Sequence, residues 1–146
     1  MAKSSTAGII DTVEEWFGKL PALPKEAREV IAKITPWIAL IFGILGILGS
    51  IAALGIVTVF SPLAMVGGGV QAAGAGIIAT VLGLVSSALL LAAFPGTKKF
   101  RLSGWNFLFY SETVSLLSAV LAISITGILV SLIGYYLLFQ IKSQYK

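Results

Sequence analysis

Three long apolar runs constrain the fold of this chain more than any other feature. They cover residues 36–60, 61–94 and 104–141, and Glu112 is the one charged residue within them. A helix needs ~20 mostly apolar residues to cross the hydrocarbon core of a bilayer. Only 11% of the 146 residues are charged, whereas a soluble domain carries roughly 25%. The sequence therefore predicts an all-α integral membrane protein.

The first run predicts one membrane span at residues 36–60. Thr35 and Pro36 stand at its start, and these residue types favour the N-cap and the first turn of a helix. We therefore expect a helix to begin here, separate from a short amphipathic helix that the pattern predicts at residues 24–33.

The second run is too long for one crossing, because it would make a helix of ~50 Å. The three glycines at residues 67–69 are the expected break. We place a short surface turn or helix at residues 62–66 before them and a span at residues 70–94 after them.

The third run would make a single helix of ~57 Å, against ~30 Å of hydrocarbon. Two spans at residues 104–123 and 126–141 fit better, joined by a tight turn near residues 123–127. Thr126 and Gly127 are plausible turn and capping residues. The chain is then a bundle of four transmembrane helices, arranged as two antiparallel hairpins.

The basic residues predict how the spans are oriented. With four spans, all Lys and Arg residues fall on one side of the membrane, and the two loops on the other side carry none. The positive-inside rule makes the basic side cytoplasmic. These residues are Lys3, Lys19, Lys25, Arg28, Lys33, Lys98, Lys99, Arg101, Lys142 and Lys146. We predict a transmembrane domain at residues 36–146 in a cytoplasmic or inner membrane, with both termini in the cytoplasm.

Residues 1–35 form the predicted cytoplasmic segment, and residues 6–20 have the pattern of an amphipathic helix. The apolar face comprises Ile9, Ile10, Val13, Trp16, Phe17 and Leu20, and the polar face Asp11, Glu14, Glu15 and Lys19. Two interpretations stay open: the helix covers the protein's own spans, or it binds the lipid surface or a partner. As a cover, its acids would pair with the basic loop at residues 98–101.

Small residues at regular intervals predict close contacts between helices. Spacings of three or four residues let two backbones approach, which strengthens van der Waals packing in lipid. The positions are Gly43, Gly46 and Gly49, then Gly68, Ala72 and Gly76, and finally Gly127 and Ser131. These faces serve either packing within the bundle or association with a second copy.

Glu112 is the candidate for a polar site inside the membrane. A charged side chain at the bilayer centre costs ~2.5–3.5 kcal/mol on insertion scales, so we expect its carboxyl group to face protein or water. The hydroxyls expected near its depth belong to Ser115, Ser86, Ser87, Tyr135 and Tyr136. Glu112 is then either a proton or cation site, or a structural acid that fixes the register of the helices.

The residue types present exclude several classes of function. The chain has no Cys and no His, which excludes disulfides, thiolate nucleophiles and Cys/His zinc sites. We predict a protein that is not an enzyme and has no cofactor, metal or nucleic-acid partner. Our leading hypothesis is a scaffold or accessory bundle in the lipid bilayer, associating with itself or with another membrane protein. The alternative is a small proton- or cation-coupled transporter or channel that uses Glu112.

Overall fold

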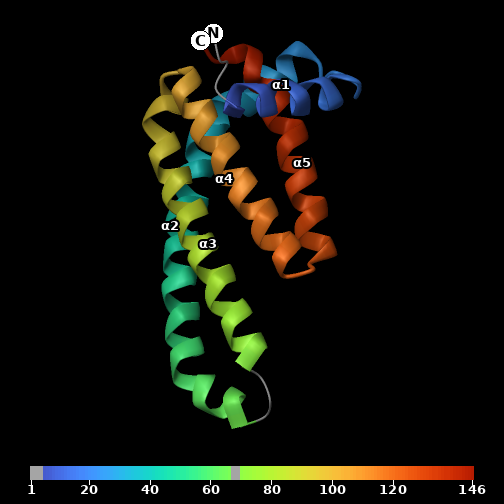
Figure 1. Ribbon diagram of the computed structural model, residues 1–146. Helices are drawn as coiled ribbons and strands as arrows, with labels where there is room; N and C mark the ends of the chain where they lie inside the picture. The colour runs from blue at the N-terminus through green and yellow to red at the C-terminus, as the bar shows by residue number, and fades with distance from the viewer. Residues whose placement is uncertain (1–4, 67–69) are drawn as a thin grey trace.

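The computed structural model describes residues 5–66 and 70–146, and in this part of the chain the regular secondary structure is all helical (Figure 1). The prediction of an all-α fold is confirmed. The elements are α1 at Ser5–Gly18, α2 at Lys25–Val66, α3 at Val70–Lys98, α4 at Leu102–Leu121 and α5 at Ile125–Ile141, followed by a 3-10 turn at Lys142–Gln144.

Three of the described helices are long and apolar enough to cross a membrane. These segments are Lys25–Phe60 in α2, Gly76–Lys98 in α3, and Ile125–Gln144 in α5 and the following turn. α4 is less apolar, because it carries Asn106, Glu112 and several serines along its length.

The helices pack in chain order. α2 and α3 form a long antiparallel pair, and α4 and α5 form a shorter hairpin beside the half of that pair nearest the chain ends (Figure 1). α4 lies between α3 and α5, whereas α2 and α5 contact each other only sparsely. The four long helices therefore leave a seam, a line of sparse contact, between α2 and α5.

α2 is one continuous helix, so the predicted separation of a surface helix from the first span at Thr35 is wrong. The Thr35 hydroxyl donates to the Ile31 carbonyl at 2.6 Å instead of capping a new helix. Pro36 lies inside the helix, and its fixed φ is compatible with helical backbone. Pro62 also lies inside α2, which runs to Val66, so the segment predicted as a short surface turn or helix is helical and continuous with the first span. The predicted break at residues 67–69 lies outside the described residues.

The predicted division of the third run is confirmed, because α4 ends at Leu121 and α5 begins at Ile125. The cap differs from the expected residues: Ser124 accepts a hydrogen bond from the Gly127 N–H at 3.1 Å. Ile123 stands at φ 51° in the turn. This left-handed conformation costs a β-branched residue roughly 1–2 kcal/mol.

Aromatic side chains form the core at the end of the bundle where α1 and the C-terminus lie. Trp105 is fully buried, stacks on Phe109 with ring centroids 5.7 Å apart, and donates its indole N–H to the Leu138 carbonyl at 2.8 Å. Phe109 packs edge-on against Tyr135 and Phe139. Tryptophan and tyrosine in such spans usually mark the lipid interface, but Trp105 and Tyr135 hold helices together here.

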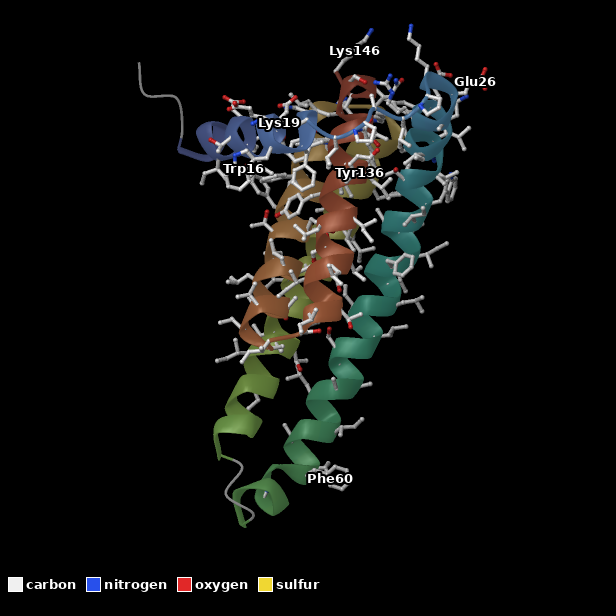
Figure 2. All side chains as sticks on the ribbon, turned by 90° about the vertical axis from the view of Figure 1, so that its right-hand side faces the viewer. Trp16, Lys19, Glu26, Phe60, Tyr136 and Lys146 are labelled. Atoms are coloured by element: carbon white, nitrogen blue, oxygen red, sulfur yellow. The ribbon has the colours of Figure 1, made fainter. Side chains whose placement is uncertain are left out.

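α1 lies across the same end of the bundle (Figure 1). Part of its apolar face packs against the bundle, and the rest is exposed. Ile10 and Phe17 pack against the aromatic core, whereas Ile9 and Trp16 remain 58% and 67% exposed. In Figure 2, Trp16 lies on the side of α1 that faces the long helices, and Lys19 lies on the side that faces away from them. α1 is thus a cover that also presents an amphipathic surface of its own.

One acid of α1, Glu14, takes a different partner from the one expected. Glu14 forms an ion pair with Lys142 after α5, instead of pairing with the loop at residues 98–101. Lys98 lies 5.7 Å from the ring centroids of both Trp37 and Phe94. The labelled charged residues Lys19, Glu26 and Lys146 all lie at this end, and Phe60 lies near the other (Figure 2).

Candidate functional site

Three serines join α3 to α4 in the middle of the bundle. The Ser86 hydroxyl lies 2.9 Å from the Ser111 hydroxyl and 2.7 Å from that of Ser115. The Ser111 hydroxyl also donates to the Ser86 carbonyl at 2.9 Å. Ser86 and Ser111 are buried, so these hydrogen bonds replace the water that the hydroxyls would otherwise need.

The Glu112 carboxyl group lies between α4 and α5, on the side of α4 that faces Gly134. A methyl group added at Gly134 would stand 2.6 Å from Glu112 Oε1. The absence of a side chain at Gly134 therefore creates the space that the carboxyl group occupies. The Ser131 hydroxyl lies within hydrogen-bonding reach of the carboxyl group, one turn away on α5.

The hydroxyls predicted to surround Glu112 have other partners. Ser86 and Ser115 bind each other, and the Ser87 hydroxyl donates to the Gly83 carbonyl of its own helix. The Tyr135 hydroxyl donates to Thr113 at 2.7 Å, and the Tyr136 hydroxyl donates to the Pro21 carbonyl at 2.7 Å. Ser131, which the sequence suggested only as a packing residue, is the hydroxyl that reaches the acid.

An apolar groove of about 510 Å³ follows the seam between α2 and α5. Its volume is in the range of ligand pockets, which is roughly 300–1,000 Å³. Ile31 to Phe42 of α2 and Val130 to Ile141 of α5 form its two long sides, and Glu112 contributes to its wall. Both polar groups in the lining have partners: Thr35 binds the Ile31 carbonyl, and Glu112 lies beside Ser131.

A second cavity, of about 330 Å³, lies between α2, α3 and α4. Five serines line it, namely Ser50, Ser86, Ser87, Ser115 and Ser118. Phe42 and Leu90 line this cavity and the apolar groove alike. Two apolar side chains therefore lie between a serine-lined space and the groove that contains Glu112.

The predicted small-residue faces are used unequally. A Cβ at Gly43 would lie 2.7 Å from Leu91 Cδ2, and one at Gly46 would collide with the Ser87 hydroxyl, so both glycines face α3. A Cβ at Gly49 would meet no atom within 4 Å. On α5, a Cβ at Gly127 would lie 2.9 Å from Ala119 Cβ.

The second predicted face is described only in part. Gly68 lies outside the described residues, as does the side chain of Ala72. The Gly76 carbonyl accepts a hydrogen bond from the Thr80 hydroxyl at 2.7 Å, which is a contact within α3.

A close contact between two backbones was missed by the sequence analysis. Gly96 and Gly104 face each other where α3 meets α4, and a Cβ on Gly96 would stand 2.6 Å from the Gly104 N and Cα. The Arg101 N–H donates to the Gly96 carbonyl at 2.9 Å within the same turn. The sequence did offer a signal, because Gly96 and Gly104 stand on either side of the short basic loop. Glycine at such positions lets two backbones approach closely.

Among residues 5–66 and 70–146, no three His, Cys, Asp or Glu residues gather as a metal site. The candidate site is therefore one carboxyl group, a few hydroxyls and two adjoining cavities between helices. Comparisons of the chain with protein families, curated proteins and solved structures found no match.

Proposed function

We propose that this chain is an integral membrane protein that crosses the bilayer four times and acts as a non-enzymatic scaffold or accessory bundle. The observation that carries the proposal is the outer surface of α2. Large apolar side chains along it are 46–68% exposed, and no charge interrupts them beyond Lys33. They include Ile38, Ile41, Phe42, Ile44, Leu45, Leu48, Ile51, Ile56, Val59 and Phe60. Soluble proteins rarely expose an apolar patch of this extent.

The packing of α4 supports a fourth span even though α4 is the least apolar of the long helices. Its 20 residues give a length of ~30 Å, which matches the hydrocarbon thickness. It lies between α3 and α5, and its polar side chains Ser111, Thr113 and Ser115 have hydrogen-bond partners on those helices. A span whose polar groups face neighbouring helices needs less apolar surface toward lipid.

The hydrogen bonding of the polar groups supports a structural function over a catalytic one. The serine cluster, the Tyr135–Thr113 pair and the Glu112–Ser131 contact each join two helices. Polar contacts of this kind between spans contribute on average ~0.6 kcal/mol each. The free outer face of α2 is then the surface available to a second copy or to another membrane protein.

Single-cysteine labelling tests the topology directly, because the chain contains no Cys. Ser61→Cys, just beyond the apolar segment that ends at Phe60, and Ile125→Cys, at the start of α5, probe one side, and Lys99→Cys and Lys146→Cys probe the other side. In intact cells, a membrane-impermeant maleimide should label the first pair, and the second pair should react only after permeabilisation. Equal labelling of all four positions would contradict the four-span topology.

Proton- or cation-coupled transport is the second candidate function. The observation in its favour is that Glu112 lines the apolar groove, and that Phe42 and Leu90 separate this groove from the serine-lined cavity. Rotation of those two side chains would join a carboxyl group to five serines across the bundle. The apolar lining of the groove weighs against a hydrated path, which is why we rank this candidate second.

Flux measurements separate the two candidates. Proteoliposomes loaded with a pH-sensitive dye, and separately with a K⁺-sensitive dye, should show the same leak with wild type, with Glu112→Gln and without protein if the bundle is a scaffold. A protein-dependent flux that Glu112→Gln abolishes, and that Glu29→Gln on the exposed start of α2 retains, would establish transport instead.

A further inference from the structure

A cavity of about 340 Å³ lies at the charged end of the molecule, between the start of α2, the end of α5 and α1. Arg28 of α2 and Lys142 after α5 line it, together with Ser143, Tyr145 and the acid Glu14. Two cations and two hydroxyls thus meet in one space. Groups of this kind bind a phosphate or a carboxylate.

The cavity also collects the unpaired polar groups of the molecule. Within residues 5–66 and 70–146, the buried side-chain atoms without a hydrogen-bond partner are Arg28 Nε and the Tyr145 hydroxyl. Both residues line this cavity. A buried donor without a partner costs about 1–3 kcal/mol, so two such donors in one cavity indicate an acceptor that binds there.

The Tyr145 hydroxyl is suited to donate. Burial raises its pKa to about 12, outweighing the Thr35 hydroxyl, which lowers it. The hydroxyl is therefore protonated at neutral pH. The nearby Thr35 hydroxyl gives its proton to the Ile31 carbonyl, and the Tyr145 hydroxyl makes no hydrogen bond within the described residues, so its proton is available to a ligand.

This polar cavity adjoins the apolar groove. On α2, Arg28 lines the cavity and Ile31, one turn later, begins the groove; on α5, Lys142 lines the cavity and Ile141 lines the groove. The groove extends from Ile31 to Phe42 along α2, which is about 16 Å of helix. Half of the hydrocarbon core is about 15 Å thick. A cationic cavity above an apolar groove of one-leaflet length matches the shape and charge of a phospholipid.

We propose that one anionic phospholipid binds between α2 and α5, with its phosphate at Arg28, Lys142 and Tyr145 and one acyl chain in the apolar groove. The inference rests on the proposed membrane topology, which places this end of the bundle at the cytoplasmic leaflet. Basic pockets between spans on that side suit anionic headgroups. Glu14 already pairs with Lys142, so Arg28 supplies the unpaired charge and Lys142 exchanges its partner when the lipid binds.

Native mass spectrometry of the detergent-solubilised protein tests the headgroup half of the site. Phosphatidylglycerol and phosphatidylcholine with identical acyl chains are titrated in parallel. Wild type should bind one phosphatidylglycerol about tenfold more tightly than phosphatidylcholine, as expected for a charge-assisted contact. Arg28→Gln should remove this preference. Lys33→Gln, with the same change of charge on the same helix but outside the cavity, should retain it.

A second pair of variants tests the groove. Ile133 and Leu129 of α5 are 60% and 56% exposed, but only Ile133 lines the groove. Ile133→Trp should fill the groove and reduce phosphatidylglycerol binding about tenfold, and Leu129→Trp should leave it unchanged. Sodium phosphate distinguishes a lipid from a free anion, because it should not displace the lipid at equal concentration.

Several outcomes would overturn the proposal: equal binding of the two lipids, equal behaviour of Arg28→Gln and Lys33→Gln, unchanged binding to Ile133→Trp, or displacement by phosphate alone. If Arg28→Gln does not fold, Tyr145→Phe removes one hydroxyl and should weaken binding severalfold; full binding would count against the site. The cysteine labelling tests the proposed membrane topology independently, because its result does not depend on any bound lipid.

Discussion

Gly96 and Gly104 lie against each other where α3 meets α4, so closely that a Cβ on Gly96 would stand 2.6 Å from both the Gly104 N and its Cα. The atoms in the way belong to backbone, which cannot rotate aside as a side chain does. This contact fixes the angle at which α4 leaves α3. It therefore determines where Glu112, eight residues further along α4, lies within the bundle.

Gly96→Ala should accordingly destabilise the protein by about 1–3 kcal/mol, the usual cost of overpacking. Thermal unfolding in detergent measures the change. The matched control is Gly55→Ala in α2, where an added Cβ meets no atom within 4 Å. The control should be neutral or up to about 1 kcal/mol more stable, because alanine favours helix over glycine. Equal melting temperatures for the two variants would disprove the close contact.

Gly46 and Gly49 separate internal packing from self-association. Gly46→Leu should disrupt the α2–α3 pair, because the side chain would collide with Ser87. Gly49→Leu should leave the fold intact, since Gly49 faces open space. If a second copy packs on α2, Gly49→Leu should reduce the dimer fraction seen by cross-linking in membranes. A dimer fraction that is unchanged in Gly49→Leu would show that the two copies do not meet at the Gly49 face of α2.

Ser86 is the centre of the serine cluster, so Ser86→Ala should cost about 1 kcal/mol of stability. Its loss leaves the Ser115 hydroxyl without its partner on α3, whereas the Ser111 hydroxyl still donates to the carbonyl of residue 86. Ser118→Ala is the control, because Ser118 lines the same cavity outside this hydrogen-bonded cluster. Unfolding by denaturant should show a shifted midpoint for Ser86→Ala alone. Identical midpoints would mean that the cluster contributes nothing measurable.

Gly134 makes room for the Glu112 carboxyl group, so Gly134→Ala should push that group toward the apolar groove. The contact is with the end of a flexible side chain, and we expect the fold to survive. Reaction with a lipophilic carbodiimide, measured by mass spectrometry of the Glu112 adduct, should become severalfold faster in Gly134→Ala. Gly49→Ala, on the outer face of α2, should react like wild type. No acceleration would show that Gly134 does not confine the acid.

Ionisation of the buried Tyr145 hydroxyl should lower the free energy of unfolding at high pH. Burial raises its pKa to about 12, against about 10 in an unfolded chain. The folded state thus holds the proton more tightly, so this contribution is complete below about pH 10 and is lost as the pH rises toward 12. Between pH 9 and 12, wild type should lose up to about 2 kcal/mol more stability than Tyr145→Phe. If the stability of the two proteins fell in parallel with pH, the pKa of Tyr145 would not be raised by burial.

The apolar runs indicated most of the helical segments, because a helix pairs the backbone groups of a long uncharged run within itself. The turn that divides the third run likewise followed from the sequence, and the labelled Lys19 and Lys146 lie at the same end of the bundle (Figure 2). What local pattern could not reveal was the pairing of side chains across helices. Thr35 and Pro36 have the residue types of a helix start, yet α2 continues through them because packing outweighs local preference.

The partners of Glu112 show the same limit. Depth counted along each helix suggested Ser86, Ser87, Tyr135 and Tyr136, but depth does not determine which way a side chain points. The rotation of α4, set by the contact between Gly96 and Gly104, turns Glu112 toward α5 and Ser111 toward α3. Sequence by itself determined the helices and the one-sided charge. Only the tertiary structure decided which faces meet, because that depends on contacts between residues far apart in the chain.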